Sequence, residues 1–442
     1  MRSRVRIAII LLVFLSFWPS RVADSWPPAR PAKPLVQFIP SEVVKIGLEE
    51  LSQQGVDVNN QGIYIESLDG SRIVASHNAD VLFNPASVAK LATSTFALWK
   101  LGPNSRFATR AAYQGSWNSQ MQRIQGDLMV DSDGDPLFRM GEARVFASRL
   151  RQAGVRSVSG DLAIAGPFCL NGNYSPEESA QRMEKILRSA GIQIQGTTRL
   201  ENRDTLMGTR HDQVPSANQP TVLTHSGESG PLILEHRSVP LRDILWHQNA
   251  HSVNVIADRL GASLGGPSAM ERFLQQEVGI SLREMYFTRN SGLDANGLTP
   301  RATVKLTRFL YQWLQTRGMN LLDILPAAGV DSGTLSDRFL RPEYRGCVIA
   351  KTGTQSSWNE GVSVLAGMLS TRKGQFFFAI YNSHGDIRFY RRWQDLLVKR
   401  FLEESGGGVP WKEEAKEPID IYSAEWNLQI SPTVSRHAQS AE

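Results

Sequence analysis

Cysteine is scarce in this chain, which contains only Cys169 and Cys347 among its 442 residues. Two cysteines exclude a scaffold held together by many disulfides, and they exclude a metal site built from several thiolates. The sequence leaves open whether the two pair with each other. A chain of this length can bury a large hydrophobic core, and the fold is expected to rest on one.

Long hydrophobic runs are also missing. The apolar stretch at residues 7–18, IAIILLVFLSFW, is shorter than the about 17–25 residues that a membrane span needs. Arg2, Arg4 and Arg6 precede it, and a basic start followed by a short apolar run is typical of an export signal. We predict that residues 1–23 are a signal peptide. Because no good Ala-x-Ala cleavage site follows, an uncleaved membrane anchor is the alternative.

A large excess of one charge is absent as well. The chain has 48 Lys and Arg against 43 Asp and Glu, which leaves a net charge of +5. Since no basic block with interleaved aromatic residues is present, nucleic acid is not an expected partner. Hydrophobic residues at 41% and charged residues at 21% are typical of a folded globular protein. The length predicts two or three domains, at about 100–200 residues each.

The order of strand and helix signals predicts an α+β protein with an insertion. Residues 24–40 are rich in proline and predict an extended lead. Alternation around Asp69-Gly70 predicts two antiparallel strands, and the stretches CVIAKTGT, VSVLAGMLS and FFFAIYNS predict three more near the end. We expect the five strands to form one antiparallel sheet flanked by helices. The expected boundaries are 41–110 plus 236–403 for a discontinuous main domain, 111–235 for an inserted α+β domain, and 404–442 for a flexible tail.

Ser87 and Lys90 lie three residues apart in FNPASVAK, where the apolar spacing predicts the start of a helix. On a helix, positions i and i+3 are neighbours, so Lys90 can lie beside the serine hydroxyl. A serine becomes a good nucleophile when a base takes its proton, and a lysine can do so when burial or a second cation lowers its pKa. In a purely structural role, Ser87 would cap the helix and Lys90 would be solvated.

Ser252 and Asn254 form a second candidate group, in HQNAHSVNVIADRL. Residues i and i+2 of a helix point apart, so these two converge on one site only if the backbone turns there. A loop between two helices would allow it. The hydroxyl could then relay a proton to a leaving amine and the amide could hold a substrate carbonyl, whereas the alternative is that the pair caps the following helix.

Lys351, Thr352, Gly353 and Thr354 end the apolar strand CVIAKTGT. In a strand Lys351 and Gly353 share a face, and a glycine allows a bound chain to approach the backbone closely. This triplet is rarer by chance than the two serine motifs. The alternative is a plain strand end with a solvated lysine.

Together, Ser-x-x-Lys, Ser-x-Asn and Lys-Thr-Gly in this order resemble the motifs of the penicillin-recognising acyl-serine transferases. The long gap before Ser252, with VDSDGDPLF, SGLDANGLTPRA and PAAGVDSGTL, is similar to the D-alanyl-D-alanine carboxypeptidase/endopeptidase family of low-molecular-mass penicillin-binding proteins, peptidase family S13. The resemblance covers roughly residues 40 to 402. It implies the penicillin-binding transpeptidase/β-lactamase-like fold, with the main domain as the catalytic domain.

The resemblance also implies the role of each motif. Ser87 is expected to attack the D-Ala-D-Ala carbonyl of a peptidoglycan stem peptide, with Lys90 as the base. Ser252 and Asn254 are expected to relay a proton and contact the substrate. Lys351, Thr352, Gly353 and Thr354 are expected to bind the substrate, its terminal carboxylate above all, and the backbone N–H groups of Ser87 and Thr354 to form the oxyanion hole. No metal or other cofactor is implied.

The same resemblance implies a bacterial periplasmic or cell-envelope location and β-lactams as inhibitors. A membrane contact is expected only through an uncleaved N-terminal anchor. Two other functions remain open: a β-lactamase or esterase of the same superfamily, and a wall-binding protein without turnover. The β-lactamase reading is disfavoured because no Glu-x-x-Leu-Asn segment is placed to supply a deacylating glutamate. The sequence leaves open the balance of carboxypeptidase and endopeptidase action, the stem-peptide type and the oligomeric state.

Two departures from the family pattern stand out. The short segment PFCLNGNYSPEES closes the place where members often carry a further insertion, so a second inserted module is expected to be missing. Members commonly read Ser-Gly-Leu-Ser-Arg where this chain has Ser291-Gly292-Leu293-Asp294-Ala295. The lost cation puts the side-chain preference for the stem peptide in doubt.

Two further clusters invite a functional interpretation. The spacing of Asp131, Asp133, Asp135 and Glu142 matches an EF-hand calcium loop, but Pro136 occupies the place where that loop needs glycine. His247 and His251 flank the second motif, yet the lysine scheme needs no histidine. We expect the histidines to lie on a polar helix surface.

Overall fold

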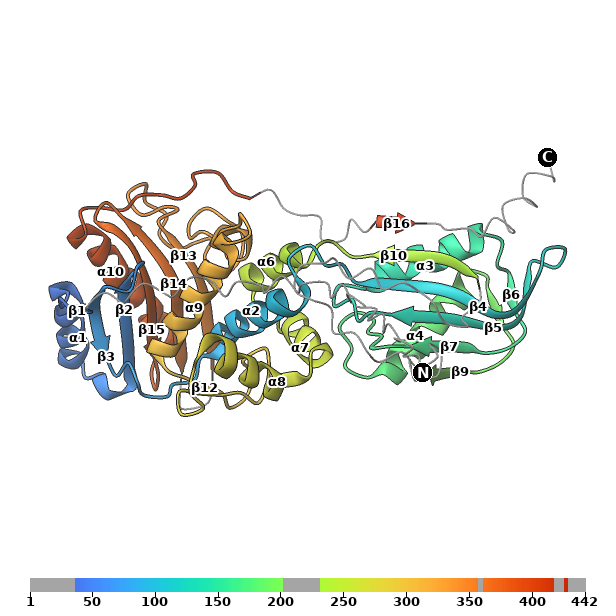
Figure 1. The fold of residues 1–442 in the computed structure, drawn as a ribbon, viewed down its shortest axis with the longest axis horizontal. Helices are drawn as coiled ribbons and strands as arrows, with labels where there is room; N and C mark the ends of the chain where they lie inside the picture. Colours follow the sequence, from blue (N-terminus) through green and yellow to red (C-terminus); the bar gives the residue numbers. More distant parts are fainter. Residues whose placement is uncertain (1–35, 202–230, 357–360, 417–424, 428–442) are drawn as a thin grey trace, which may run out of the picture.

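The computed structural model describes residues 36–201, 231–356, 361–416 and 425–427. They form two bodies at opposite ends of an elongated molecule (Figure 1). The first body comprises residues 36–107 and 238–416, and the second comprises residues 108–201, 231–237 and 425–427. The predicted signal or anchor at residues 1–23 lies outside the described residues. Within them, no helix has both the length and the apolar character that crossing a membrane requires.

The first body is built on a six-stranded sheet in the order β1-β3-β2-β15-β14-β13. Its strands are β1 (Gln37–Phe38), β2 (Gln61–Ser67), β3 (Arg72–His77), β13 (Val348–Gln355), β14 (Val362–Thr371) and β15 (Gly374–Asn382). Five of them pair antiparallel, which confirms the predicted five-stranded sheet. The short β1 adds a sixth strand, parallel to β3. Two paired residues leave no alternation in the sequence, so β1 has no sequence signal.

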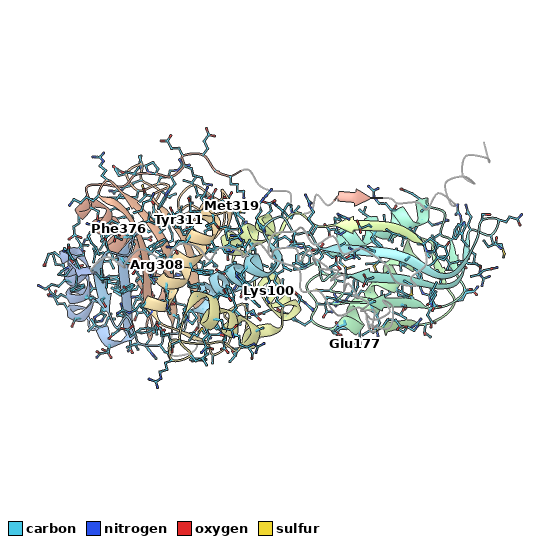
Figure 2. All side chains as sticks on the ribbon, viewed as in Figure 1. Lys100, Glu177, Arg308, Tyr311, Met319 and Phe376 are labelled. Carbon is cyan, nitrogen blue, oxygen red and sulfur yellow. The ribbon has the colours of Figure 1, made fainter. Side chains whose placement is uncertain are left out.

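The central strands of this sheet are buried on both faces. Neighbouring residues point to opposite sides: the ring of Phe376 lies 5.2 Å from that of Phe401, and the ring of Phe377 lies 5.7 Å from that of Tyr311. Figure 2 labels Phe376 and Tyr311 in the first body. Burial on both faces explains why FFFAIYN reads as a continuous apolar run rather than as an alternating one.

Helices cover both faces of the first sheet. One face packs against α1 (Glu42–Gln53) and α10 (Ile387–Glu404). On the other face, α9 (Pro300–Gln315) contacts β2, β14 and β15, and α2 (Ala89–Leu101) packs beside α9. Three more helices pack around α2: α6 (Leu241–His251), α7 (Asn254–Ser263) and α8 (Gly266–Phe273). Shorter elements are η1 (Val58–Asn60), η2 (Ala86–Val88), η3 (Leu274–Val278) and η4 (Leu321–Asp323), with the strand pair β11 (Met285–Tyr286) and β12 (Gly297–Leu298). The candidate residues lie where α2, α6, α7 and β13 meet.

Within its described residues, the second body contains a mixed sheet and two helices, α3 (Met140–Gln152) and α4 (Pro176–Ser189). Its strands are β4 (Ala108–Asn118), β5 (Arg123–Ser132), β6 (Ser157–Val158), β7 (Leu162–Ala165), β8 (Gln193–Ile194), β9 (Thr198–Glu201), β10 (Leu232–Arg237) and β16 (Glu425–Asn427). β7 is parallel to β5 and to β9, and the two helices make the crossovers that parallel strands need. The strands begin and end slightly outside the predicted boundaries of 111 and 235.

Of the predicted flexible tail, residues 404–416 and 425–427 are described, and residues 417–424 and 428–442 lie outside the described residues. The described part makes contacts with both bodies. Residues 405–416 lie on the first body, where the Trp411 N–H donates to the carbonyl of Gly346 at 3.0 Å and Lys412 Nζ lies 2.6 Å from Asp331 Oδ1. β16 then joins the edge of the second sheet beside β10. Polar composition suggested flexibility, but backbone pairing and a buried carboxylate at Asp331 supply partners that composition does not reveal.

The two cysteines do not pair. Cys169 lies in the second body and Cys347 in the first, and both are free and buried. The question that the sequence left open is therefore answered by their separation into different bodies.

Candidate active site

Ser87 lies in the single turn η2 that leads into α2. It is half-buried, whereas Ala86 and Val88 beside it are buried. Ala86 has a positive φ of 44°, and its N–H donates to Asn84 Oδ1 at 2.8 Å. A Cβ on Gly292 would lie 1.9 Å from the Ala86 carbonyl oxygen, so only glycine fits there. The segment SGLDANG thus packs directly against the turn that presents Ser87.

Lys90 follows Ser87 by one turn, and its side chain is completely buried. Its Nζ lies 2.9 Å from Ser87 Oγ, 2.6 Å from Asn254 Oδ1 and 2.6 Å from the carbonyl oxygen of Ser291. Burial lowers the pKa of Lys90 to about 7, although the charge of Asp258 acts in the opposite direction. At neutral pH a large fraction of this lysine is therefore the free amine, which can accept a proton.

Ser252 and Asn254 converge on the same site because the chain turns between α6 and α7. Ser252 ends α6 in the left-handed conformation, with φ 57° and ψ 43°, and α7 begins at Asn254. The Val253 N–H donates to the Gln248 carbonyl at 3.0 Å and closes the turn. The sequence required a turn such as a loop between two helices for this convergence, and the observed turn brings Asn254 to Lys90 and Ser252 to Lys351.

Lys351 reaches the site from β13. Its Nζ donates to Ser252 Oγ at 3.0 Å and to the carbonyl of Thr352 at 2.8 Å. Burial and the neighbouring Lys90 hold the pKa of Lys351 well below its ordinary value. The site therefore contains two buried amines, one beside each serine hydroxyl.

The packing around position 353 explains why a glycine occurs there. A Cβ there would lie 2.5 Å from the carbonyl oxygen of Pro85, so the backbone that approaches this glycine closely is the protein's own. The sequence suggested instead that a bound chain would approach it. The contact brings the end of β13, including the exposed Thr354, against the turn that carries Ser87.

Three contacts in the site have no clear signal in the sequence. The carbonyl of Ser291 binds Lys90, Thr334 Oγ1 accepts a hydrogen bond from Thr352 Oγ1 at 2.8 Å, and Arg391 Nη2 donates to Thr354 Oγ1 at 2.7 Å. Ser291 and Thr334 lie in segments that the family resemblance had indicated, SGLDANG and PAAGVDSGTL. Arg391 could not be predicted, because one arginine among several on an exposed helix face has no distinguishing pattern.

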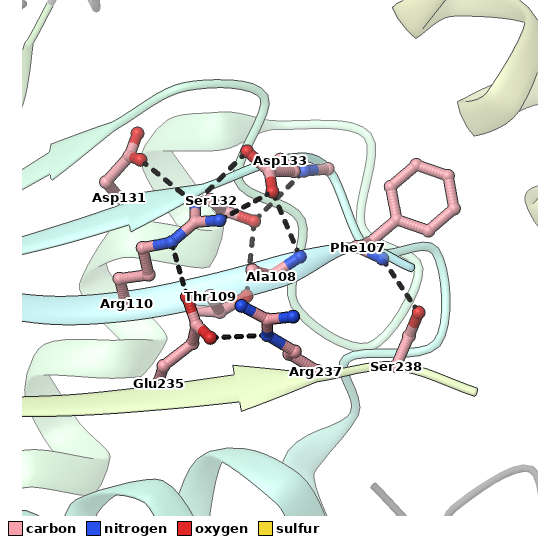
Figure 3. Close-up of polar contacts among 11 residues, drawn as sticks. Phe107, Ala108, Thr109, Arg110, Asp131, Ser132, Asp133, Glu235, Arg237 and Ser238 are labelled. Carbon is pink, nitrogen blue, oxygen red and sulfur yellow. Dashed lines mark hydrogen bonds and ion pairs between the residues drawn. The ribbon is translucent and has the colours of Figure 1, made fainter. Parts of the chain in front are cut away.

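The acidic residues with EF-hand spacing lie in the second body, and Figure 3 shows two of them, Asp131 and Asp133. Asp131 and Asp133 face Arg110, and Glu142 Oε2 accepts from the Arg139 N–H at 3.1 Å at the start of α3. Within the described part of the chain, no group of three or more metal-ligating side chains is placed to hold an ion. Asp131 and Asp133 therefore pair with Arg110, and Glu142 caps the start of α3.

His247 and His251 lie on α6 with ring centroids 4.7 Å apart. His251 is exposed, as expected for a polar helix surface, whereas His247 is only half-exposed. Burial, with smaller contributions from His251 and Arg139, lowers the pKa of His247 to about 4. His247 is therefore neutral at physiological pH, and among the described residues neither ring is hydrogen-bonded to the serine–lysine network.

Comparison with known proteins shows the family to which the chain belongs. The family described as "D-Ala-D-Ala carboxypeptidase 3 (S13) family" matches residues 44–180 and 170–398. The D-alanyl-D-alanine carboxypeptidase DacB of Haemophilus influenzae is 22% identical over 433 residues, which covers 77% of this chain and 88% of that protein. Carboxypeptidase DacB of Mycolicibacterium smegmatis is 28% identical over 342 residues, covering 70% of this chain and 73% of that protein.

Solved structures match the same fold. The predatory peptidoglycan endopeptidase Bd3459 of Bdellovibrio bacteriovorus matches with a TM-score of 0.64 and 20% identity, over 83% of this chain and 98% of that chain. Penicillin-binding protein 4 (dacB) of Haemophilus influenzae matches with a TM-score of 0.63 and 19% identity, over 81% of this chain and 98% of that chain. At these identities the structural likeness establishes the fold.

Proposed function

The chain belongs to the D-Ala-D-Ala carboxypeptidase 3 (S13) family, and on that premise we propose that it removes the terminal D-Ala from peptidoglycan stem peptides through an acyl-enzyme on Ser87. The observation that carries this proposal is the hydrogen-bonded group formed by Ser87, Lys90 and Asn254, with Ser252 and Lys351 beside it. It contains a nucleophile, a buried base and a second hydroxyl that a lysine can keep supplied with a proton.

The acylation step follows from these contacts. The neutral amine of Lys90 takes the proton of Ser87 Oγ while that oxygen attacks the carbonyl carbon between the two D-Ala residues. The negative charge on the carbonyl oxygen is bound by the backbone N–H groups of Ser87 and Thr354. When the C–N bond breaks, the proton that Lys90 took from Ser87 passes through the hydroxyl of Ser252 to the departing amine, and Lys90 becomes neutral again. The products are free D-Ala and an ester on Ser87.

Deacylation reverses the proton transfers. Water attacks the ester, a basic amine of the site accepts its proton, and Ser87 Oγ leaves and regains a proton. All the groups required are side chains and backbone amides of this chain. In a crosslink the leaving group is the amine of a second stem peptide instead of free D-Ala, and the same chemistry is then an endopeptidase reaction. We therefore propose both activities, with the carboxypeptidase as the principal one.

Substrate binding is assigned to β13 and its neighbours. We propose that the hydroxyls of Thr352 and Thr354 receive the terminal carboxylate of the stem peptide, with the amine of Lys351 as a further hydrogen-bond donor behind them. The close approach of Gly353 to Pro85, the residue before the turn that carries Ser87, supports this assignment. β-Lactams carry an equivalent carboxylate beside a reactive carbonyl, so they are expected to acylate the same serine and act as inhibitors.

The substrate also determines where the enzyme acts. Peptidoglycan lies outside the bacterial cytoplasm, so we propose export to the periplasm or cell envelope, directed by the basic and apolar residues of segment 1–23.

The test is a mass measurement on the purified protein. Incubation with benzylpenicillin should add the mass of one ligand, and peptide mapping should place it on Ser87, while the Ser87→Ala variant should remain unmodified. Release of D-Ala from a stem pentapeptide tests the activity itself. Rapid loss of the adduct would favour a β-lactamase, and an unmodified wild-type protein would contradict the acyl-serine mechanism and favour a wall-binding role.

A further inference from the structure

Asp258 lies one turn after Asn254 on α7, so the two side chains share a helix face. Asp258 is buried, with 9% of its surface exposed, and its Oδ1 accepts a hydrogen bond from the Ser291 N–H at 2.8 Å. The carbonyl of that same residue accepts from Lys90 Nζ at 2.6 Å. The carboxylate therefore fixes the residue whose carbonyl binds the amine of Lys90.

The orientation of that amine decides whether it can act as a base. A neutral lysine amine has two N–H donors and one lone pair. Asn254 Oδ1 and the Ser291 carbonyl both lie 2.6 Å from Nζ and can accept the two N–H groups. The lone pair then points to Ser87 Oγ at 2.9 Å, from which it must take the proton. If the Ser291 carbonyl moved, one N–H would be free to rotate and the lone pair would lose its direction.

The second oxygen of Asp258 is held from two sides. Its Oδ2 accepts from Arg289 Nη2 at 2.9 Å and from the hydroxyl of Tyr174 at 3.1 Å. Tyr174 belongs to the second body, in the loop between β7 and α4. The guanidinium groups of Arg259 and Arg289 lie 4.9 and 5.7 Å from the centre of its ring.

The same loop packs closely on the first body. A Cβ on Gly172 would lie 2.9 Å from Cγ2 of Val255 on α7. The backbone at Gly172 has a positive φ of 71°, which a glycine adopts without strain. The second body therefore reaches the helix that carries Asn254 and Asp258 both by packing and by a hydrogen bond to a buried carboxylate.

We propose that Asp258 and Tyr174 form a positioning pair through which the second body holds the Ser291 carbonyl against Lys90 and directs the lone pair of Lys90 to Ser87. This inference rests on the proposed acyl-serine function and assigns to the inserted body a part in it. Neither residue touches the reacting atoms. Asp258 acts through Ser291, and Tyr174 acts through Asp258.

The charges around the pair give the proposal a measurable signature. Asp258 on α7 is the negative charge near Lys90, and Lys351 on β13 is a second titratable amine, whose own pKa is lowered by burial and by Lys90. Asp258 is itself faced by Arg289 and Tyr174, with Arg259 over the tyrosine ring. Since the carboxylate raises the pKa of Lys90 against the effect of burial, removing its charge lowers that pKa further. The acid limb of the acylation rate then moves to lower pH.

The experiment measures the second-order rate of Ser87 acylation by a fluorescent penicillin, from about pH 5 to pH 9. Asp258→Asn keeps the shape of the side chain but loses the charge. It should lower the plateau rate about tenfold or more and shift the acid limb to lower pH. Asp258→Glu keeps the charge and should leave the limb closer to that of the wild type.

Tyr174→Phe isolates the contribution of the second body. It removes one hydroxyl, keeps the ring under the two arginines and keeps the charge of Asp258, so we expect a plateau rate about threefold to tenfold lower with little shift of the limb. Tyr286→Phe, which removes a hydroxyl from an exposed tyrosine in β11, is the matched control and should match the wild type. Thermal midpoints of all variants test whether each one is folded.

The outcomes separate the two levels of the proposal. If the wild type is not acylated on Ser87, the proposed function fails and the positioning pair falls with it. If the wild type is acylated but Asp258→Asn and Tyr174→Phe keep its plateau rate and its acid limb, the pair alone is overturned. A lower thermal midpoint with an unchanged rate and limb would assign Asp258 a purely structural role, and this too would overturn the pair.

Discussion

Each body of this protein buries a positive charge, but the two bodies surround it differently. In the first body, Lys90 is fully buried, and the hydrogen-bond partners of its amine among the described residues are neutral oxygen atoms. In the second body, Arg110 is 7% exposed and contacts carboxylates: its Nε lies 2.8 Å from Glu235, its Nη2 lies 3.2 Å from Asp133, and Asp131 lies near its Nη1 (Figure 3).

The different partners give opposite pKa shifts. Without a carboxylate in contact, burial lowers the pKa of Lys90 to about 7. Burial also acts to lower the pKa of Arg110, but Asp133 and Glu235 outweigh it and raise that pKa above its ordinary value. A buried cation that keeps its charge joins three strands, β4, β5 and β10, whereas a buried cation that can lose its charge is available for proton transfer.

The strongest test of this difference gives the first body a permanent charge. Lys90→Arg replaces an amine that can become neutral by a guanidinium that cannot, so acylation of Ser87 by penicillin should fall about 10²–10⁴-fold. Lys100→Arg, at an exposed position of the same helix, is the matched control and should retain the wild-type rate. Normal acylation of Lys90→Arg would contradict the assignment of Lys90 as the base.

The reverse change replaces the buried Arg110 of the second body by an uncharged side chain. Arg110→Met leaves Asp133 and Glu235 without their cation, and we expect the free energy of unfolding to fall by about 3–5 kcal/mol. Denaturant unfolding of the full chain measures this effect. Arg110→Lys, which keeps the charge but loses the planar guanidinium, should lose less stability. Unchanged stability in Arg110→Met would show that water, rather than the arginine, compensates these carboxylates.

The pH profile sharpens the comparison without any mutation. Lys90 is active as the unprotonated amine, so acylation should rise about tenfold per pH unit below about 7 and level off above it, as the fraction of free amine saturates. The same profile should appear in Arg110→Lys, because that residue lies in the other body. A rate that is flat from about pH 5 to pH 9 would show that proton removal by Lys90 does not limit acylation.

The smallest expected effect concerns a cation that is neither buried nor paired with a carboxylate among the described residues. Arg391 is exposed and donates to Thr354 Oγ1, at the end of β13 where we place the substrate carboxylate. Arg391→Gln should raise the KM for a stem pentapeptide about tenfold or less, with kcat little changed. Arg392→Gln, the exposed neighbour on α10, is the control, and an equal effect of both variants would indicate a general effect of charge.

Much of the first body could be predicted because its signals are local. The Asp69-Gly70 turn, the apolar stretches around Ala350, Ala366 and Ala379, and the three motifs each depend on a few neighbouring residues. The elements that the sequence did not predict include the helices α1, α3 and α8 and the short strands β1 and β16, which pair over two and three residues. Strand pairings this short depend on the tertiary placement of the segment, and two or three residues are too few to show a periodic pattern in the sequence.

The sequence by itself determined which chemical groups are available, because the spacing of Ser87 and Lys90 places a hydroxyl and an amine on neighbouring positions of one helix. It also determined the likeness to a family, since three motifs occur in a fixed order. Only the tertiary structure decided that Lys90 can be neutral. Its lowered pKa arises because α7, β13 and the Ser291 carbonyl together exclude water from the amine, and these segments lie far apart in the chain.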